Sequence, residues 1–143
     1  MTRSISYDQV EIGTEIPALT RQPTSRQLVK WAAFSGDISE IHYDKDFAVK
    51  QGLPGVIVQG SLVLSFLAQM LTDWIGEDGI LRELACSFRG MNSLGDPVTC
   101  RGKVTGKSAR NGEHCLECEI WAENAKGEST IPGTAVVVLP SMD

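Results

Sequence analysis

The stretch FSGDISEIHYD, residues 34–44, places an acid and a base close together in the chain. Asp37 and His42 are five residues apart, whereas side chains that face each other on a helix are three or four apart. In an irregular loop that begins at Gly36, however, both side chains can fold back toward one small volume. General acid and base catalysis requires such an arrangement. Asp37 and His42 are therefore the first candidate catalytic residues.

Other ionisable residues have simpler explanations. Asp44 and Asp46 could supply further acids, but they flank the predicted turn into a short helix, where aspartate caps are common. His114 falls in a predicted strand on the same face as Leu116, which favours a partly buried histidine with satisfied hydrogen bonds. We expect structural roles for all three.

The four cysteines do not have the spacing of a metal site. In HCLEC, Cys115 and Cys118 lie in a predicted strand and point to opposite faces of the sheet. The sequence has no second CxxC pair to complete a zinc site. We expect no metal, and free thiols typical of a reducing compartment at Cys86, Cys100, Cys115 and Cys118.

Two predicted helices flank the loop at residues 34–44. In TSRQLVKWAAF, Thr24 is a suitable N-cap and Gln27 completes a capping box. This helix ends just before Gly36 and has one apolar face formed by Leu28, Trp31 and Ala32. A short strand is expected before it, around residues 14–20.

The second helix is predicted for residues 61–75, after Gly60, and is apolar almost all round, as buried helices are. Gly76 fits its C-cap. Its polar residues recur every three or four positions and form one stripe of Ser61, Ser65, Gln69 and Thr72. Either this stripe is solvated or has its hydrogen bonds satisfied, or it faces a cavity or a partner.

Four segments after Gly79 have the alternation of strands, and turn residues separate them. They span residues 81–89, 98–107, 114–123 and 130–139, and Asn111-Gly112 is the clearest hairpin signal. We expect these four strands to form an antiparallel meander with one face covered by the long helix. The predicted fold class is α+β, with a sheet wrapped around a central helix in one domain, residues 1–143.

Composition excludes several function classes. The chain has 143 residues, 42% of them hydrophobic, and a formal net charge of -5, so it lacks the basic field that nucleic-acid binding uses. The N-terminal MTRSISYDQVEIG has no apolar signal core, and the longest apolar stretch, residues 62–71, is too short to span a bilayer. We expect a cytoplasmic protein with neither nucleic acid nor membrane as a partner.

Three blocks of the sequence resemble one family of acyl-thioester enzymes. The blocks are SGD-x-S-E-I-H-Y-D-x-x-F-A (residues 35–48), P-G-V-I-V-Q-G-S-L (54–62) and SFRGMNSLGDPV (87–98). They resemble the MaoC-like (R)-specific enoyl-CoA hydratases and 3-hydroxyacyl thioester dehydratases, which have the hot-dog fold. The resemblance implies reversible hydration of trans-2-enoyl-CoA without a cofactor, in a homodimer with acyl tunnels at its interface. Acyl-CoA is the expected substrate, and an acyl-carrier-protein thioester is the alternative.

The resemblance also assigns roles to residues. Asp37 and His42 match the catalytic motif and would activate water and transfer protons. The N–H of Gly60, at the start of the buried helix, would hold the negative charge that builds on the thioester oxygen. Ser39, Gln59 and Ser61 are further candidates for oxyanion support or substrate binding.

Two positions depart from the family's pattern. Ser39-Glu40 stands where the family usually has Asn-Pro, and this affects loop shape because proline restricts its own backbone and that of the preceding residue. Gln59 stands where the family usually has His, although glutamine can also form hydrogen bonds. The backbone donor at Gly60 does not depend on that side chain.

Two other functions stay open on the sequence alone. A hot-dog thioesterase would also use a carboxylate and a helix N-terminus, but the SGD…H loop is not the usual place for its carboxylate. A non-catalytic acyl-binding or assembly subunit of a hydratase complex would account for the missing Asn-Pro and His.

Overall fold

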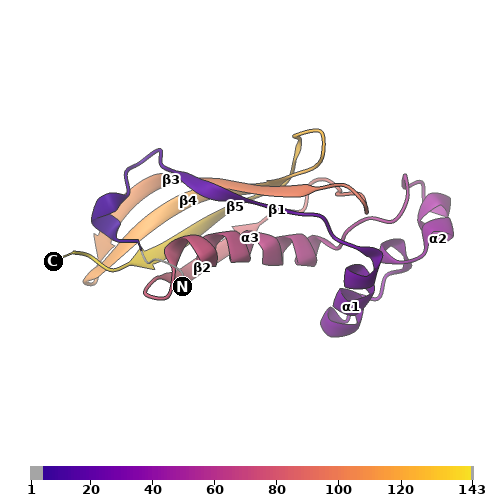
Figure 1. Ribbon diagram of the computed structural model, residues 1–143, viewed down its shortest axis with the longest axis horizontal. Helices are drawn as coiled ribbons and strands as arrows, with labels where there is room; N and C mark the ends of the chain where they lie inside the picture. Colours follow the sequence, from indigo (N-terminus) through magenta and orange to yellow (C-terminus); the bar gives the residue numbers. More distant parts are fainter. Residues whose placement is uncertain (1–4, 143) are drawn as a thin grey trace.

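A five-stranded antiparallel sheet and one long helix form the centre of the computed structural model, which describes residues 5–142 (Figure 1). The strands lie in the order β1-β3-β4-β5-β2. Their bounds are β1 Glu15–Arg21, β2 Ile80–Cys86, β3 Val98–Arg110, β4 Glu113–Glu123 and β5 Ser129–Leu139. Helix α3, Gly60–Ile75, contacts all five strands. The predicted α+β hot-dog fold is confirmed.

The apolar character of α3 explains its central position. Its buried side chains are Leu62, Val63, Phe66, Leu67, Met70, Leu71 and Ile75. Alternate residues of β3 and β4 complete the core from the sheet side, as the strand period requires: Cys100, Val104, Leu116, Cys118 and Ile120. Gly76 caps the helix as predicted, and its N–H donates to the Thr72 carbonyl.

Helix α1, Ser25–Ser35, leads into the candidate catalytic loop. The Gln27 N–H donates to Thr24 Oγ1 at 3.2 Å, which confirms the predicted N-cap. Gly36 ends the helix with a φ of 80°, a left-handed conformation that glycine adopts without a steric penalty. Figure 1 shows α1 at one end of the molecule, beside the N-terminal end of α3.

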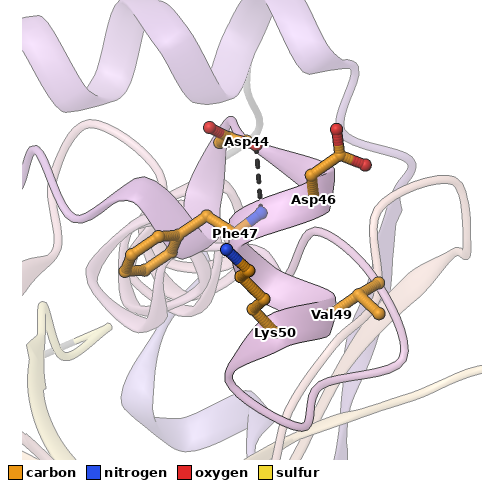
Figure 2. A pocket seen from close by; sticks show the side chains of 5 residues that line it. All are labelled: Asp44, Asp46, Phe47, Val49 and Lys50. Carbon is orange, nitrogen blue, oxygen red and sulfur yellow. Dashed lines mark hydrogen bonds between the residues drawn. The ribbon is translucent and has the colours of Figure 1, made fainter.

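Two short elements lie between α1 and α3: the 3-10 turn η2, Glu40–His42, and helix α2, Lys45–Lys50. Asp44 caps α2, as predicted, by accepting from the Phe47 N–H at 3.1 Å (Figure 2). Asp44, Asp46 and Lys50 line an open hollow beside this helix. This hollow is separate from the Asp37–His42 pair described below.

The Asn111-Gly112 hairpin is confirmed. It joins β3 to β4, and both residues have positive φ angles, 52° for Asn111 and 79° for Gly112. A two-residue type I′ turn requires this geometry at both central positions.

The predicted four-strand meander is wrong. Strands β3, β4 and β5 follow one another in that way, but β2 pairs with β5 at the edge of the sheet, with Leu84 opposite Ala135. The segment after β2 explains the difference. The N–H groups of Ser87 and Arg89 donate to carbonyls of residues 132 and 130, so the chain continues along β5 before it crosses to β3.

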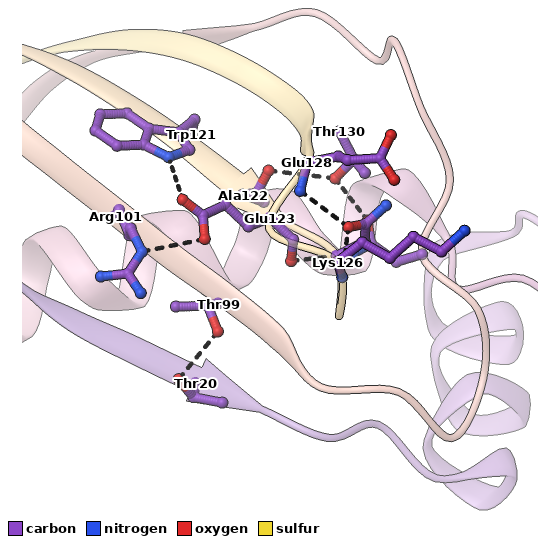
Figure 3. A network of polar contacts seen from close by, with 11 residues as sticks. Thr20, Thr99, Arg101, Trp121, Ala122, Glu123, Lys126, Glu128 and Thr130 are labelled. Carbon is purple, nitrogen blue, oxygen red and sulfur yellow. Dashed lines mark hydrogen bonds and ion pairs between the residues drawn. The ribbon is translucent and has the colours of Figure 1, made fainter.

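A buried polar cluster fixes this crossing segment. The Thr130 hydroxyl lies 2.8 Å from Asn92 Oδ1 and 3.3 Å from the Ala122 carbonyl, and Asn92 Nδ2 donates to the Glu123 carbonyl at 3.4 Å. Figure 3 shows Thr130 beside the end of β4. Because Asn92 and Thr130 are both buried, these bonds satisfy groups that water does not reach.

The end of β4 also carries an ordered carboxylate. Glu123 accepts from Trp121 Nε1 at 2.9 Å and from Arg101 Nε at 3.1 Å (Figure 3). The Trp121 hydrogen bond, reinforced by Arg101, holds the pKa of Glu123 below its ordinary value. These contacts tie β3 to β4 close to the crossing segment.

Between residues 5 and 142, no helix has both the length and the apolar character needed to cross a membrane. The expectation about the N-terminal segment rests partly on residues 1–4, which lie outside the described residues.

The β2–β5 pairing can be tested at Gly133. A Cβ at this position would collide with the backbone carbonyl of Ala85 on β2. Gly133→Ala should therefore lower the free energy of unfolding by about 1–3 kcal/mol, measured by urea denaturation. Gly55→Ala is the matched control, because a Cβ there meets no atom within 4 Å. A Gly133→Ala variant as stable as the control would contradict the pairing.

Candidate active site

Asp37 and His42 lie side by side, as predicted. Asp37 Oδ2 is 3.6 Å from His42 Nε2. The imidazole is buried, whereas the carboxylate side chain is 45% exposed. Gly36 turns the chain back after α1, and the Asp37 N–H donates to Ser35 Oγ at 3.1 Å. The loop thus presents an accessible carboxylate to a buried ring.

A backbone carbonyl fixes the His42 ring. His42 Nδ1 lies 2.8 Å from the Ile57 carbonyl oxygen. Because a carbonyl only accepts, Nδ1 must carry a proton, and the neutral ring then has its lone pair at Nε2. The Ile57 N–H donates in turn to the Ile41 carbonyl at 3.1 Å. This pair of bonds joins the candidate catalytic loop to the segment before α3.

The separation of the two side chains suits a shared water. At 3.6 Å, Asp37 Oδ2 and His42 Nε2 are too far apart for a direct hydrogen bond. With the carboxylate ionised and the imidazole neutral, both atoms are acceptors. One water molecule can donate a proton to each.

The Ser39-Glu40 step keeps the backbone shape that a following proline favours. Ser39 has φ -59° and ψ 129°, close to the polyproline II conformation, which is open to a residue before proline. Its carbonyl accepts from the His42 N–H at 3.1 Å. The Ser39 side chain is exposed and makes no cap hydrogen bond, so its observed contribution to the loop is through the backbone.

Gly60 begins α3. The N–H groups of Gly60 and Ser61 precede the first bonds of this helix, which the N–H groups of residues 62 and 63 make to the Gln59 carbonyl. Such leading N–H groups favour an anion. A Cβ at residue 60 would lie 2.6 Å from a ring carbon of Phe88. The glycine therefore lets Phe88 pack directly against the start of the helix, a contact that sequence patterns did not predict.

Gln59 joins α1 to α3. It is fully buried, and its Nε2 donates to the Leu28 carbonyl of α1 at 2.7 Å. Its Oε1 is also buried and has no donor among the described residues. A neutral histidine likewise offers one donor and one acceptor. Gln59 can thus replace the ring of the family's usual residue without adding a charge.

A second bond joins the same two helices. Trp31 Nε1 donates to Ser61 Oγ at 2.8 Å. The sequence identified Trp31 only as part of the apolar face of α1, because nothing in the helical period reveals the partner of an indole N–H. Ser61 is half-buried and lies next to Gly60.

The crossing segment supports the other side of the site. The Val58 N–H donates to the Asn92 carbonyl at 2.8 Å, and Ile57 forms an isolated bridge with Ser93. The strand-like pairing of residues 56–58 with residues 92–94 therefore positions the Ile57 carbonyl that holds His42. Sequence analysis missed Asn92 because its partners are distant in the chain.

Asp44 has the capping role that we expected, and the partial burial predicted for His114 is observed. His114 is half-buried and its ring lies 4.9 Å from the Tyr7 ring. Burial raises the pKa values of the Cys100 and Cys118 thiols to about 12. Within residues 5–142, no three His, Cys, Asp or Glu side chains are grouped so that they could hold a metal ion.

The chain is similar to known proteins over most of its length. The family model described as "MaoC like domain" matches residues 8–124. The 3-oxo-4,17-pregnadiene-20-carboxyl-CoA hydratase beta subunit of Mycobacterium tuberculosis is 26% identical over 132 residues, which cover 92% of this chain and 97% of that protein.

Solved structures give the same result. The (R)-hydratase from A. caviae involved in PHA biosynthesis has a TM-score of 0.82 at 26% identity, with 92% of this chain and 98% of that chain covered. The R-hydratase PhaJ1 from Pseudomonas aeruginosa has a TM-score of 0.85 at 24% identity, with 96% and 87% covered, and shares the fold. Since the family model spans most of the sequence, the chain belongs to the MaoC-like dehydratase family.

Proposed function

We propose that this protein is a hydratase/dehydratase that interconverts trans-2-enoyl-CoA and (R)-3-hydroxyacyl-CoA thioesters. The observation that carries the proposal is the Asp37–His42 pair, in which the Ile57 carbonyl fixes the ring and Nε2 lies 3.6 Å from the carboxylate. Membership of the MaoC-like family supports it, and two similar proteins are themselves named hydratases.

Asp37 and His42 act on one water. The water donates one proton toward His42 Nε2 and the other toward Asp37 Oδ2, which leaves an oxygen lone pair to attack C3. As the C3–O bond forms, the pair removes one proton from the water, and in a second step the pair delivers a proton to C2. The C=C π bond is thus replaced by one C–O and one C–H bond. Dehydration is the reverse and uses the same two residues.

Gly60 stabilises the charge that develops during this reaction. The electrons of the broken π bond move onto the thioester oxygen before C2 is protonated. The N–H of Gly60 donates to that oxygen, and the positive end of the α3 dipole adds to the stabilisation. Gln59 supports the turn through its bond to α1 and does not itself need to touch the substrate.

The site is expected to be completed by a second copy of the chain. Within residues 5–142, no strand pairs with the outer edge of β2, and Ile80 on this strand is half exposed. Large apolar side chains near the candidate site are also exposed: Phe34, Ile38, Phe88 and Met91. A homodimer would cover such surface and enclose the acyl chain.

Further features of the proposal concern setting and substrate. We place residues 1–143 in a single MaoC-like hot-dog domain, because β5 completes the sheet after the matched region ends at residue 124. The four free cysteines favour the cytoplasm. Acyl-CoA remains the first substrate to test, in keeping with a role in fatty acid metabolism.

A non-catalytic subunit is the second candidate. The curated relative is named a beta subunit of its hydratase, so an assembly with a chain of different sequence is a specific alternative. In that case the isolated chain would bind acyl thioesters without converting them.

The purified chain should remove the enoyl absorbance of crotonyl-CoA without releasing free thiol. Asp37→Asn and His42→Ala should each lower kcat roughly a hundredfold or more. The double variant should have a kcat only slightly lower than that of the less active single variant, because both groups act on one water. Asp44→Asn is the matched control, since asparagine also caps a helix and should leave kcat unchanged.

Each alternative outcome identifies a different function. Released thiol would indicate a thioesterase. Single variants with nearly normal turnover would contradict the hydratase proposal, and an inactive wild type that binds the substrate would favour the subunit. Losses that multiply in the double variant would show that Asp37 and His42 act independently.

Gln59→His tests whether Gln59 only supports the turn. Because a neutral histidine can replace both the donor and the acceptor of the amide, kcat/KM should change by less than about tenfold, or about 1.4 kcal/mol. Gln59→Leu should lower kcat/KM further, since it removes the bond to Leu28. Gln69→His, at an exposed position of α3, is the matched control. Loss of turnover in a folded Gln59→His variant would mean that the site is built differently.

Light scattering at micromolar concentration should give the mass of a dimer. Pairing would protect the β2 edge and the exposed apolar side chains near the site. A monomeric mass with full activity would remove the subunit interface from the mechanism. An inactive monomer that gains activity with a second, different chain would support the subunit alternative.

A further inference from the structure

The three hydroxyl side chains on α3 differ in how they use their protons. Ser65 donates to the Leu62 carbonyl at 2.6 Å, and Thr72 donates to the Gln69 carbonyl at 3.3 Å. Ser61 instead accepts from Trp31 Nε1 at 2.8 Å. An indole N–H is only a donor, so the Ser61 oxygen cannot use its own proton in this bond. Of these three hydroxyls, that of Ser61 keeps its proton for another acceptor.

The position of Ser61 indicates what that acceptor is. Ser61 is the second residue of α3, directly after Gly60. Trp31 belongs to α1, the helix that leads through Gly36 to Asp37. The Trp31–Ser61 bond therefore connects the helix that precedes the candidate catalytic loop to the residue that follows the proposed oxyanion donor. In the same turn, the buried Oε1 of Gln59 accepts no hydrogen bond from residues 5–142. The turn therefore contains a polar atom whose hydrogen-bonding capacity these residues leave unused.

We propose that the Ser61 hydroxyl is a second donor to the thioester carbonyl oxygen, and that Trp31 is the residue that positions it. This inference rests on the proposed hydratase function. The oxygen that gains charge during water addition accepts from the Gly60 N–H and from Ser61 Oγ–H together. Both donors are in place before the reaction, which is the condition for efficient stabilisation of the charge.

Trp31 contributes in two ways. By occupying a lone pair of Ser61 Oγ, it leaves the hydroxyl proton to point elsewhere, and the accepted bond polarises the O–H and makes it a better donor. Trp31 is half-buried and packs against the hydrophobic core, and its ring also lies 5.4 Å from the Phe34 ring. The hydroxyl is thus oriented by a core-packed side chain from a different helix.

Four variants test this assignment by steady-state kinetics with crotonyl-CoA. Ser61→Ala should lower kcat by about ten- to a hundredfold with little change in KM, because the lost bond matters most when charge develops. Ser61→Thr keeps the hydroxyl and should retain most of the activity. Trp31→Phe keeps an aromatic ring but removes the N–H, and it should lower kcat by a smaller factor. Adding Trp31→Phe to Ser61→Ala should have no further effect on kcat.

Ser65→Ala is the matched control, one turn further along α3, and it should keep wild-type kcat because the Ser65 hydroxyl bonds only within the helix.

Wild-type kcat in Ser61→Ala would overturn the donor role. Losses that multiply in the Trp31→Phe/Ser61→Ala double variant would overturn the positioning role. The two serine variants decide the donor role even if Trp31→Phe does not fold. An inactive wild type would overturn the proposed function and this inference with it, whereas an active wild type with an unaffected Ser61→Ala overturns this inference alone.

Discussion

The hydrogen bond between His42 Nδ1 and the Ile57 carbonyl is the contact on which the rest of the site depends. Because the carbonyl can only accept, it fixes both the tautomer and the orientation of the ring. It also joins two segments that would carry different parts of the proposed chemistry: the loop with Asp37, and the segment that leads into α3. Without this bond, Nε2 would have no defined direction relative to the carboxylate.

The remaining contacts place that segment relative to the sheet and the helices. Gln59 and Ser61 attach the start of α3 to α1, through Leu28 and Trp31. On the other side, residues 92–94 pair with residues 56–58, and Asn92 is anchored by Thr130 of β5. The candidate functional groups thus lie on loops and helix ends, while the buried face of α3 and the five strands provide the rigid support that such loops require.

Local signals in the sequence predicted the parts of the fold that local interactions determine. Thr24, Gly36, Gly76 and Asn111-Gly112 have the predicted positions because caps and tight turns depend on a few adjacent residues. The partner of β2 was predicted wrongly, since alternation shows that a segment is a strand but not which strand lies beside it.

For the site, Asp37 and His42 were identified as candidates from their residue types and spacing. The Ile57 carbonyl and the Trp31–Ser61 bond were not, because a backbone acceptor leaves no trace in the sequence and the other contact joins residues that are 30 positions apart.

The central claim is that the Asp37–His42 pair adds water to C3 of an enoyl thioester. The most direct measurement is to incubate the protein with crotonyl-CoA in water enriched in oxygen-18 and to analyse the product by mass spectrometry and chiral chromatography. The account predicts (R)-3-hydroxybutyryl-CoA with the label at C3 and an intact thioester. Label in a free carboxylate, or crotonyl-CoA recovered unchanged, would contradict it.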